Sequence, residues 1–371
     1  KHYPDDVVRM FVRKSVENGI DIIRIFDALN DIRNIEVAVD ETLKCGAHAS
    51  GCICYTISPI HNLESYVKLA KEIEALGVQS ICVKDMAGIM SPKEAFDLVT
   101  ALKKEIKVPI VIHTHNTTGL GPMTLMKAVE AGADVIDTAI SCFSGGTSQP
   151  PTETLVYALR EMGYEISVKE DVAKKINDFF KPVRAKYLAN GLLNPVVMGN
   201  ATDALIYQVP GGMLSNLVAQ LTAQKALDKL DAVLLEVPKV RKDLGYPPLV
   251  TPMSQMVGVQ ATVNVLTGGR YKNVSKEIKA YVKGEYGRAP GKIDPEVQKL
   301  VLGNEKPITQ RYADLLEPGF EKAKQELGDR AHSDEDVLSY IAFPAQAEAF
   351  FEKRDRKEDD NEIHFSIREV K

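Results

Sequence analysis

Two histidines stand one residue apart at the end of an apolar run, in IVIHTHNTTG at residues 110–119. In an extended segment successive side chains point to opposite faces, so His113 and His115 share a face. Two imidazoles that converge on one point are typical of a metal site. The alternative interpretation is a polar strand end that meets solvent, and the pair alone does not decide between them.

A lysine in the preceding β-rich run could complete such a site. Lys84 lies in SICVKDMAG, behind four apolar or small residues. Burial favours a neutral lysine amine, which can react with carbon dioxide to form a carbamate, an anionic oxygen ligand for a divalent metal. The alternative is an ion pair between Lys84 and a buried acid such as Asp85 or Asp27, which physical reasoning from these residues alone favours.

The elements that must position these residues alternate along the first 165 residues. Strand-like runs occur at 20–29, 49–56, 79–86, 109–115 and 134–141, separated by helical patterns. Their spacing of roughly 25 to 30 residues is that of one βαβ step, and runs that are apolar on both faces are typical of parallel strands covered by helices. Polar residues gather near the carboxyl ends of these runs: Asp27, Tyr55, Thr56, Lys84, Asp85, His113, His115, Asp137 and Thr138. A parallel α/β sheet with its active site at that edge is therefore predicted.

Spacing alone does not distinguish an open doubly wound sheet from part of an eight-stranded barrel. No Gly-x-Gly-x-x-Gly follows these strands, which weakens the dinucleotide-fold alternative. Residues 166 to about 345 are mainly helical in pattern, with proline-rich breaks at 210–212, 246–252 and 287–295. The charge run at 354–361 is typical of a solvated linker, and 362–370 alternates like a strand.

Composition excludes several classes of protein. The 371 residues are 44% hydrophobic and 26% charged, with a formal net charge of −5 and no separate Lys/Arg cluster, which argues against a nucleic-acid surface. Five cysteines without a Cys-x-x-Cys pair indicate a reducing compartment, so we expect a cytoplasmic protein. No run approaches the ~20 apolar residues of a membrane span. A helix-start signal follows Lys1 at once, and we expect that a preceding segment is missing.

Several motifs together resemble the carboxyltransferase component of biotin-dependent enzymes, over roughly residues 1 to 350. They are RIFDALNDIRN, CYTISP, VKDMAGIMSP, HTHNTTGLG, DTAISCFSGGTSQPPTE and QVPGGMLSNL, in the family's order. The family includes the oxaloacetate decarboxylase alpha subunit, the pyruvate-side transcarboxylase subunit and pyruvate carboxylase.

The resemblance implies a (β/α)8 barrel followed by a helical funnel domain. Residues 1–165 would supply barrel strands four to eight, 166–353 the helical domain, and 354–371 a charged linker and the start of a further segment. It implies a zinc, manganese or cobalt ion on carboxylated Lys84, His113 and His115. Thr202 matches the hydroxyl that shuttles a proton between biotin and pyruvate, although Thr-Asp before an apolar run is also a helix-capping signal.

The sequence departs from the family pattern in two respects. The family's aspartate metal ligand and its pyruvate-binding arginine and glutamine lie in segments before the residue that matches Lys1. The biotin-bearing Met-Lys-Met motif is absent, so biotin would be carried by a separate domain or chain. The resemblance also implies a homodimer, a biotin carrier partner and, for some members, membrane partner subunits.

The implied reaction moves carbon dioxide between carboxybiotin and pyruvate or oxaloacetate through a metal-stabilised enolate. PGGMLSNL favours the oxaloacetate decarboxylase and transcarboxylase members, with the pyruvate carboxylase B-subunit as an alternative. A Claisen-type condensing or lyase barrel is a second alternative, but such barrels usually carry Asp-Thr-x-Gly where this chain has Lys84 and its neighbours. A third is an inactive fragment that acts as a scaffold, which the retained Lys84, His113 and His115 disfavour.

Overall fold

The structure is a computed structural model, and it describes residues 2–193, 195–202, 204–205 and 211–355. In its first part, strands alternate with helices: α1 (Asp5–Glu17), β1 (Ile22–Ile25), α2 (Glu36–Lys44), β2 (His48–Cys54), α3 (Leu63–Glu74), β3 (Ser80–Asp85), α4 (Pro92–Glu105), β4 (Ile110–Thr114), α5 (Gly121–Glu130), β5 (Val135–Ile136) and α6 (Thr152–Glu161). A serine followed three residues later by a glutamate is a sequence signal for a helix start, and Ser91 and Glu94 form such a capping box at the start of α4.

All five strands are parallel and pair in the order β1-β2-β3-β4-β5, which confirms the predicted parallel α/β sheet. The register sets Lys84 opposite Cys54 on one side and opposite His113 on the other. The fifth strand is shorter than the predicted 134–141. After Ile136 the chain turns away, and its next ladder contact is an isolated bridge between Ala139 and Pro151.

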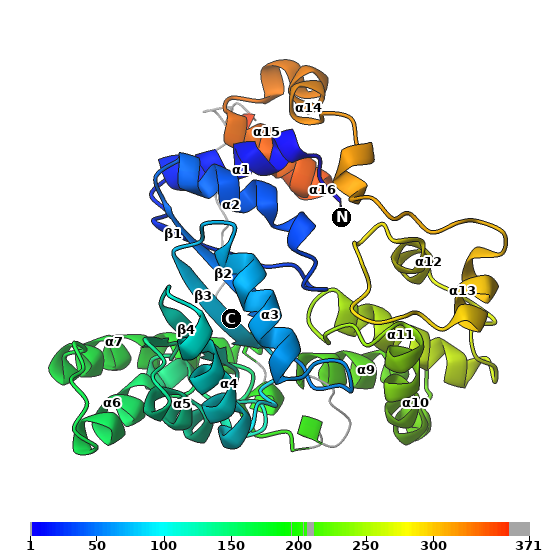
Figure 1. Cartoon of the computed structure of the whole chain (residues 1–371). Helices are drawn as coiled ribbons and strands as arrows, with labels where there is room; N and C mark the ends of the chain where they lie inside the picture. The colour runs from blue at the N-terminus through cyan, green and yellow to red at the C-terminus, as the bar shows by residue number, and fades with distance from the viewer. Residues whose placement is uncertain (1, 194, 203, 206–210, 356–371) are drawn as a thin grey trace, which may run out of the picture.

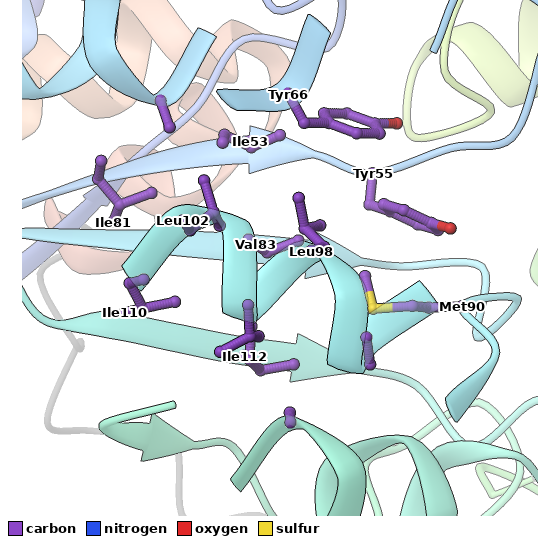
Figure 2. Packing of buried hydrophobic residues seen from close by; sticks show 14 of the residues in the cluster. Ile53, Tyr55, Tyr66, Ile81, Val83, Met90, Leu98, Leu102, Ile110 and Ile112 are labelled. Atoms are coloured by element: carbon purple, nitrogen blue, oxygen red, sulfur yellow. The ribbon is translucent and has the colours of Figure 1, made fainter. Parts of the chain in front are cut away.

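The outer face of the sheet forms the main core (Figure 2). Isoleucines and valines of β2, β3 and β4 pack there against leucines of α4 and the ring of Tyr66 from α3; they include Ile53, Ile81, Val83, Ile110, Ile112, Leu98 and Leu102. All are at most 4% exposed. Each such side chain contributes roughly 1.5–3 kcal/mol when it leaves water, so this layer fixes the strands in register.

The opposite, inner face is polar and carries the chemistry. Side chains alternate along each strand, so Ser50 and Cys52 of β2 share a face with Ser80, Cys82 and Lys84 of β3. The Ser80 hydroxyl donates to the Ser50 hydroxyl at 2.9 Å. Cys52 and Cys82 form a small buried cluster with a valine of β4. The inner face therefore changes from apolar thiols to ionisable groups towards the carboxyl ends of the strands.

The sheet is strongly curved towards this inner face. Arg24 of β1 donates from Nη2 to Oδ1 of Asp137, just after β5, at 2.8 Å. In a flat sheet, four strand spacings would separate these residues by about 19 Å, too far for two side chains to meet. The ion pair therefore requires the edge strands to bend towards one another, with the polar face concave.

The rest of the described chain is helical: α7 (Glu170–Ala189), α9 (Gly211–Ala223), α10 (Leu230–Asp243), α11 (Met253–Leu266), α12 (Lys276–Lys283), α13 (Pro295–Leu302), α14 (Phe320–Leu327), α15 (Asp334–Ala342) and α16 (Pro344–Asp355). A second core joins α9, α10, α11 and α12. Helices α14 to α16 return to pack on α1 around Val7 and Phe320 (Figure 1). No helix among the described residues is long and apolar enough to cross a membrane. The predicted strand at 362–370, and 356–361 of the charge run, lie outside the described residues.

One contact between the two parts leaves no room for a side chain. The Arg288 amide donates to Asp31 at 2.8 Å, and the Asn34 amide group donates to the Tyr286 carbonyl at 3.0 Å. Gly287 lies between them with φ +117°, and a Cβ added there would stand 2.6 Å from Asn34 Nδ2. The loop after β1 is thereby tied to the helical part through backbone groups.

We expect Gly287→Ala to destabilise the fold by about 2 kcal/mol or more, through a strained φ and a clash with the Asn34 amide. Gly19→Ala is the matched control. Its φ is +98° but nothing lies within 4 Å of the added Cβ, so only the backbone strain of ~1 kcal/mol remains. Urea unfolding of both variants measures the difference. Equal losses would contradict close packing at Gly287.

Candidate metal and active site

Lys84, His113 and His115 come together at the carboxyl edge of the sheet. Lys84 and His113 are paired residues on adjacent strands, and His115 follows two residues beyond His113 on the same face. The two imidazole rings lie edge to face with centroids 5.1 Å apart. All three side chains are half-buried. The structure thus brings the three sequence-predicted residues to one place.

A carboxylate orients His113. The Nδ1 atom of His113 lies 2.7 Å from Oδ2 of Asp137, and Asp137 is itself held by both terminal nitrogens of Arg24. Burial alone raises the pKa of Asp137, but the hydrogen bonds from Arg24 and His113 outweigh it and hold the pKa below its ordinary value. An ionised partner at Nδ1 favours the Nδ1–H tautomer and leaves the Nε2 lone pair of His113 available.

His115 is kept neutral. Burial is the main cause that lowers the pKa of His115 to about 4, and the nearby imidazole of His113 and ammonium of Lys84 lower it further. The backbone of Thr147 forms a hydrogen bond with the His115 ring. At neutral pH His115 therefore carries a lone pair, as a metal ligand requires.

The Lys84 ammonium is not ion-paired, so the alternative interpretation, a pair with Asp85 or Asp27, does not hold. Within the described ranges no carboxylate lies within 4.0 Å of it, and its Nζ stands 5.2 Å from the centroid of the Phe26 ring. A lysine over an aromatic face keeps a weak cation–π contact and remains accessible to a reaction partner.

Both acids have other partners, which explains the missing ion pair. Asp85 is fully buried and accepts hydrogen bonds from the amides of Ile89 and Met90 and from the Thr114 hydroxyl, at 2.8–3.1 Å. Asp27 similarly accepts from two backbone amides of its own loop and from an asparagine side chain. The two carboxylates thus hold the loops that follow β1 and β3 in place.

Thr202 stands beside the loop that follows β4. The amide of Ala201 donates to the carbonyl of Thr117 at 2.7 Å, and a Cβ at Gly119 would lie 2.8 Å from the Asn200 side chain. Thr202 is exposed, and its carbonyl accepts from the amide of Leu205 at 2.9 Å. Its place before a helical turn agrees with the capping interpretation, and its place beside the histidine loop agrees with a role in proton transfer.

The residues present fit a divalent metal only if Lys84 is modified. In the described part of the chain, no three His, Cys, Asp or Glu side chains form a group that could hold a metal. Two neutral imidazoles and one carbamate oxygen would supply three ligands and leave open positions. The Asp137–His113 contact is the kind of outer partner that metal-bound histidines have.

Sequence reasoning missed the partners of His113. Asp137 is one of the polar residues at predicted strand ends, but nothing in the sequence connects it to His113 or to Arg24. The signal that could have found it is geometric: strands at opposite edges of a curved parallel sheet bring their inward side chains together. Arg24 is the only basic residue of β1, and its side chain lies on the inner face of the sheet, opposite Ser50 of β2.

Another half-buried histidine, His61, closes the loop after β2. Nδ1 of His61 lies 2.6 Å from the Ser58 hydroxyl. Burial is the main cause that lowers the pKa of His61 to about 4, with a further contribution from the charge of Arg241. His61 therefore stays neutral in the folded protein down to mildly acidic pH.

Comparison with known proteins agrees with this geometry. Residues 7–179 match a family described as HMGL-like, and residues 204–368 match one described as a conserved carboxylase domain. The pyruvate carboxylase B-subunit of Methanocaldococcus jannaschii is 54% identical over 94% of this chain and 62% of its own length. The methylmalonyl-CoA carboxyltransferase 5S subunit of Propionibacterium freudenreichii is 47% identical over 95% of this chain and 70% of its own.

A solved structure shows the same fold. The carboxyl transferase domain of Rhizobium etli pyruvate carboxylase with pyruvate and biocytin superposes with a TM-score of 0.86 at 30% identity, over 95% of this chain and 62% of that one. The chain belongs to the family of biotin-dependent carboxyltransferases. It spans about three fifths of the pyruvate carboxylase subunits that it matches. Two such subunits, at 54% and 52% identity, favour the B-subunit alternative over the oxaloacetate decarboxylase interpretation.

We expect acid to destabilise the fold partly through His61. The unfolded imidazole takes up a proton near pH 6.5, whereas the folded one does so only near its pKa of about 4. The stabilising contribution is therefore complete above pH 6.5 and is lost as the pH falls to about 4, by about 1–3 kcal/mol. Urea unfolding of His61→Gln at pH 7.5 and 4.5 should show a smaller pH difference than the unmodified protein. His332→Gln, at an exposed histidine, is the control and should not change that difference.

Proposed function

We propose that this chain is the carboxyltransferase part of an enzyme that moves carbon dioxide between carboxybiotin and pyruvate, with oxaloacetate as the carboxylated product. The observation that carries the proposal is the register of Lys84 against His113 on the polar, concave face of the sheet. Family membership supports the reaction class, and the names of the relatives support pyruvate as the substrate. Reaction direction would be set by partners.

The proposed metal ligands are Lys84, His113 and His115, with zinc, manganese or cobalt as the candidate ion. When bound, such an ion supplies Lewis acidity that polarises a keto oxygen. The residues of this chain prepare the metal ligands. In its neutral form the Lys84 amine adds to carbon dioxide: a C–N bond forms as one C–O π bond opens, and the nitrogen proton passes to water, so that an anionic carbamate replaces the amine. Asp137 and Arg24 hold His113 in one tautomer and one orientation.

Thr202 is the proposed proton carrier. Its hydroxyl can accept a proton from the pyruvate methyl group while it donates its own to the ureido group of biotin, so that it is unchanged after each turnover. Its position beside the Thr117–Gly119 loop supports this role, because that loop continues directly from His115. Run in reverse, the same relay serves oxaloacetate decarboxylation.

The proposal includes a closed (β/α)8 barrel, a biotin group on a separate domain or chain, and a homodimer. Ile22 and Val135 of the two edge strands lie on the concave face and are 59% and 47% exposed, which supports further strands that would close the barrel around this interior. Relatives named as subunits support a partner that carries biotin. Membrane partner subunits, expected for some family members, also belong to the proposal. A cytoplasmic location remains part of the proposal.

A Claisen-type lyase is the weaker alternative for the barrel. The HMGL-like match covers residues 7–179 and does not by itself decide between a lyase and a carboxyltransferase. The carboxylase-domain match at 204–368 and the lysine at position 84 favour the carboxyltransferase.

We expect the purified protein to hold about one divalent ion per chain, measured by elemental mass spectrometry. Lys84→Ala and His113→Ala should each remove it, because each deletes one of three ligands. Lys93→Ala is the matched control, since its exposed ammonium is ion-paired with Asp97 on the surface of α4. Full metal content in Lys84→Ala would contradict the lysine ligand. Unfolding curves show whether the variants remain folded.

Thr202→Ala should lower the rate of oxaloacetate decarboxylation with added biotin by roughly 10²–10⁴-fold, since proton transfer loses its carrier. Thr202→Ser keeps a hydroxyl and should retain most of the rate. If the capping role alone matters, Thr202→Ala should lose stability with little effect on the rate. Thr222→Ala, at an exposed threonine of α9, controls for loss of a hydroxyl elsewhere.

A further inference from the structure

The loop after β2 is closed by a charged residue from the helical part. Arg241 of α10 is 4% exposed. Its Nη2 donates to the Thr56 hydroxyl at 2.7 Å, its Nη1 to the Ile57 carbonyl at 2.9 Å, and its Nε to the Pro247 carbonyl at 3.1 Å. One guanidinium thus joins the strand-exit loop to the turn that follows its own helix.

The same threonine is held from the other side by α3. The Thr56 amide donates to the Tyr66 hydroxyl at 2.8 Å, and that hydroxyl donates to the Thr56 carbonyl at 2.6 Å. With the contact from Arg241, both backbone polar atoms and the hydroxyl of Thr56 have partners. The Tyr66 ring also stacks on Tyr55, with centroids 5.4 Å apart.

Tyr55 connects this clamp to the candidate site. Its amide donates to the carbonyl of Lys84 at 2.9 Å, immediately beyond the paired residues Cys54 and Lys84. This is the last ladder hydrogen bond between β2 and β3 before the loops diverge. A shift of the Thr56 loop would therefore move the backbone of Lys84 relative to His113.

A buried guanidinium costs several kcal/mol in desolvation, which its partners must offset. Burial lowers the pKa of Arg241 to about 10, so the charge remains at neutral pH. The fork of donors reaches the side chain of one residue and the carbonyls of two others, a geometry that the single ammonium of a lysine does not reproduce. A contact that only packed α10 against the loop would not require three hydrogen-bond acceptors at fixed positions around one guanidinium.

We propose that Arg241 is a positioning residue that sets the place of Lys84 through Thr56 and Tyr55, so that metal binding at the sheet depends on docking of α10. The proposal rests on the proposed metal role of Lys84. The proposed coupling joins Arg241 and Lys84, which are 157 positions apart in the sequence. The helical part of the chain is therefore a component of the proposed site.

The test compares Arg241→Met with Arg270→Met. Arg270 binds Glu236 and Asp243, both on α10, at 2.6 Å each, and so anchors the same helix through contacts away from the Thr56 loop. We expect metal affinity to fall at least tenfold in Arg241→Met and to stay within twofold in Arg270→Met. Arg241→Lys should be intermediate. Thr56→Val, which removes only the hydroxyl acceptor, should reproduce part of the loss if Arg241→Met does not fold.

Hydrogen exchange at the Tyr55 amide separates this inference from the proposed function. That amide donates to Lys84, and it should exchange at least tenfold faster in Arg241→Met and Thr56→Val than in Arg270→Met. Unchanged exchange and unchanged metal affinity in folded variants would overturn the positioning role. If the unmodified protein binds no metal, the proposed function fails. Faster exchange would then still establish that Arg241 positions Lys84, and unchanged exchange would refute it.

Discussion

The two-residue alternation of side chains across a parallel sheet is the constraint on which the site depends. One face of β2, β3 and β4 carries the isoleucines and valines that bind the helices, and the other carries Lys84 and His113. A slip of one residue would exchange the two faces and place apolar side chains where the ionisable groups stand. Core packing on the outside therefore fixes the register of the site on the inside, although no site residue belongs to that core.

The strand ends are also held from the helical part of the chain. Arg288 binds the loop after β1 through Asp31, Arg241 binds the loop after β2 through Thr56, and Ala201 binds the loop after β4. Each contact uses a backbone group or a buried charge, which tolerates little displacement. The strands set the direction of the site side chains, whereas the helical part restrains the loops that follow β1, β2 and β4.

The parts that could be predicted from the sequence are those with a local signal. Strand positions, the shared face of His113 and His115 and the Ser91 cap follow from periodicity and spacing. The failures concern contacts without such a signal. The alternative ion pair of Lys84 does not form, because backbone amides of the following loop occupy the carboxylate of Asp85. The Arg24–Asp137 pair joins residues 113 positions apart, and only the curvature of the sheet reveals it.

The partners of the site also determine its charge, and the charge bears on its substrate. Arg24 neutralises Asp137, and both histidines would bind as neutral ligands. Among the described residues, a Lys84 carbamate would leave a divalent ion with one net positive charge, whereas an unmodified lysine would repel the ion. An aspartate ligand of the kind that the family resemblance implies, or the carboxylate of the proposed keto-acid substrate, would balance that remaining charge in a half-buried site. The proposed carbamate would thus make a lysine, otherwise unsuited to a cation site, compatible with a bound divalent ion.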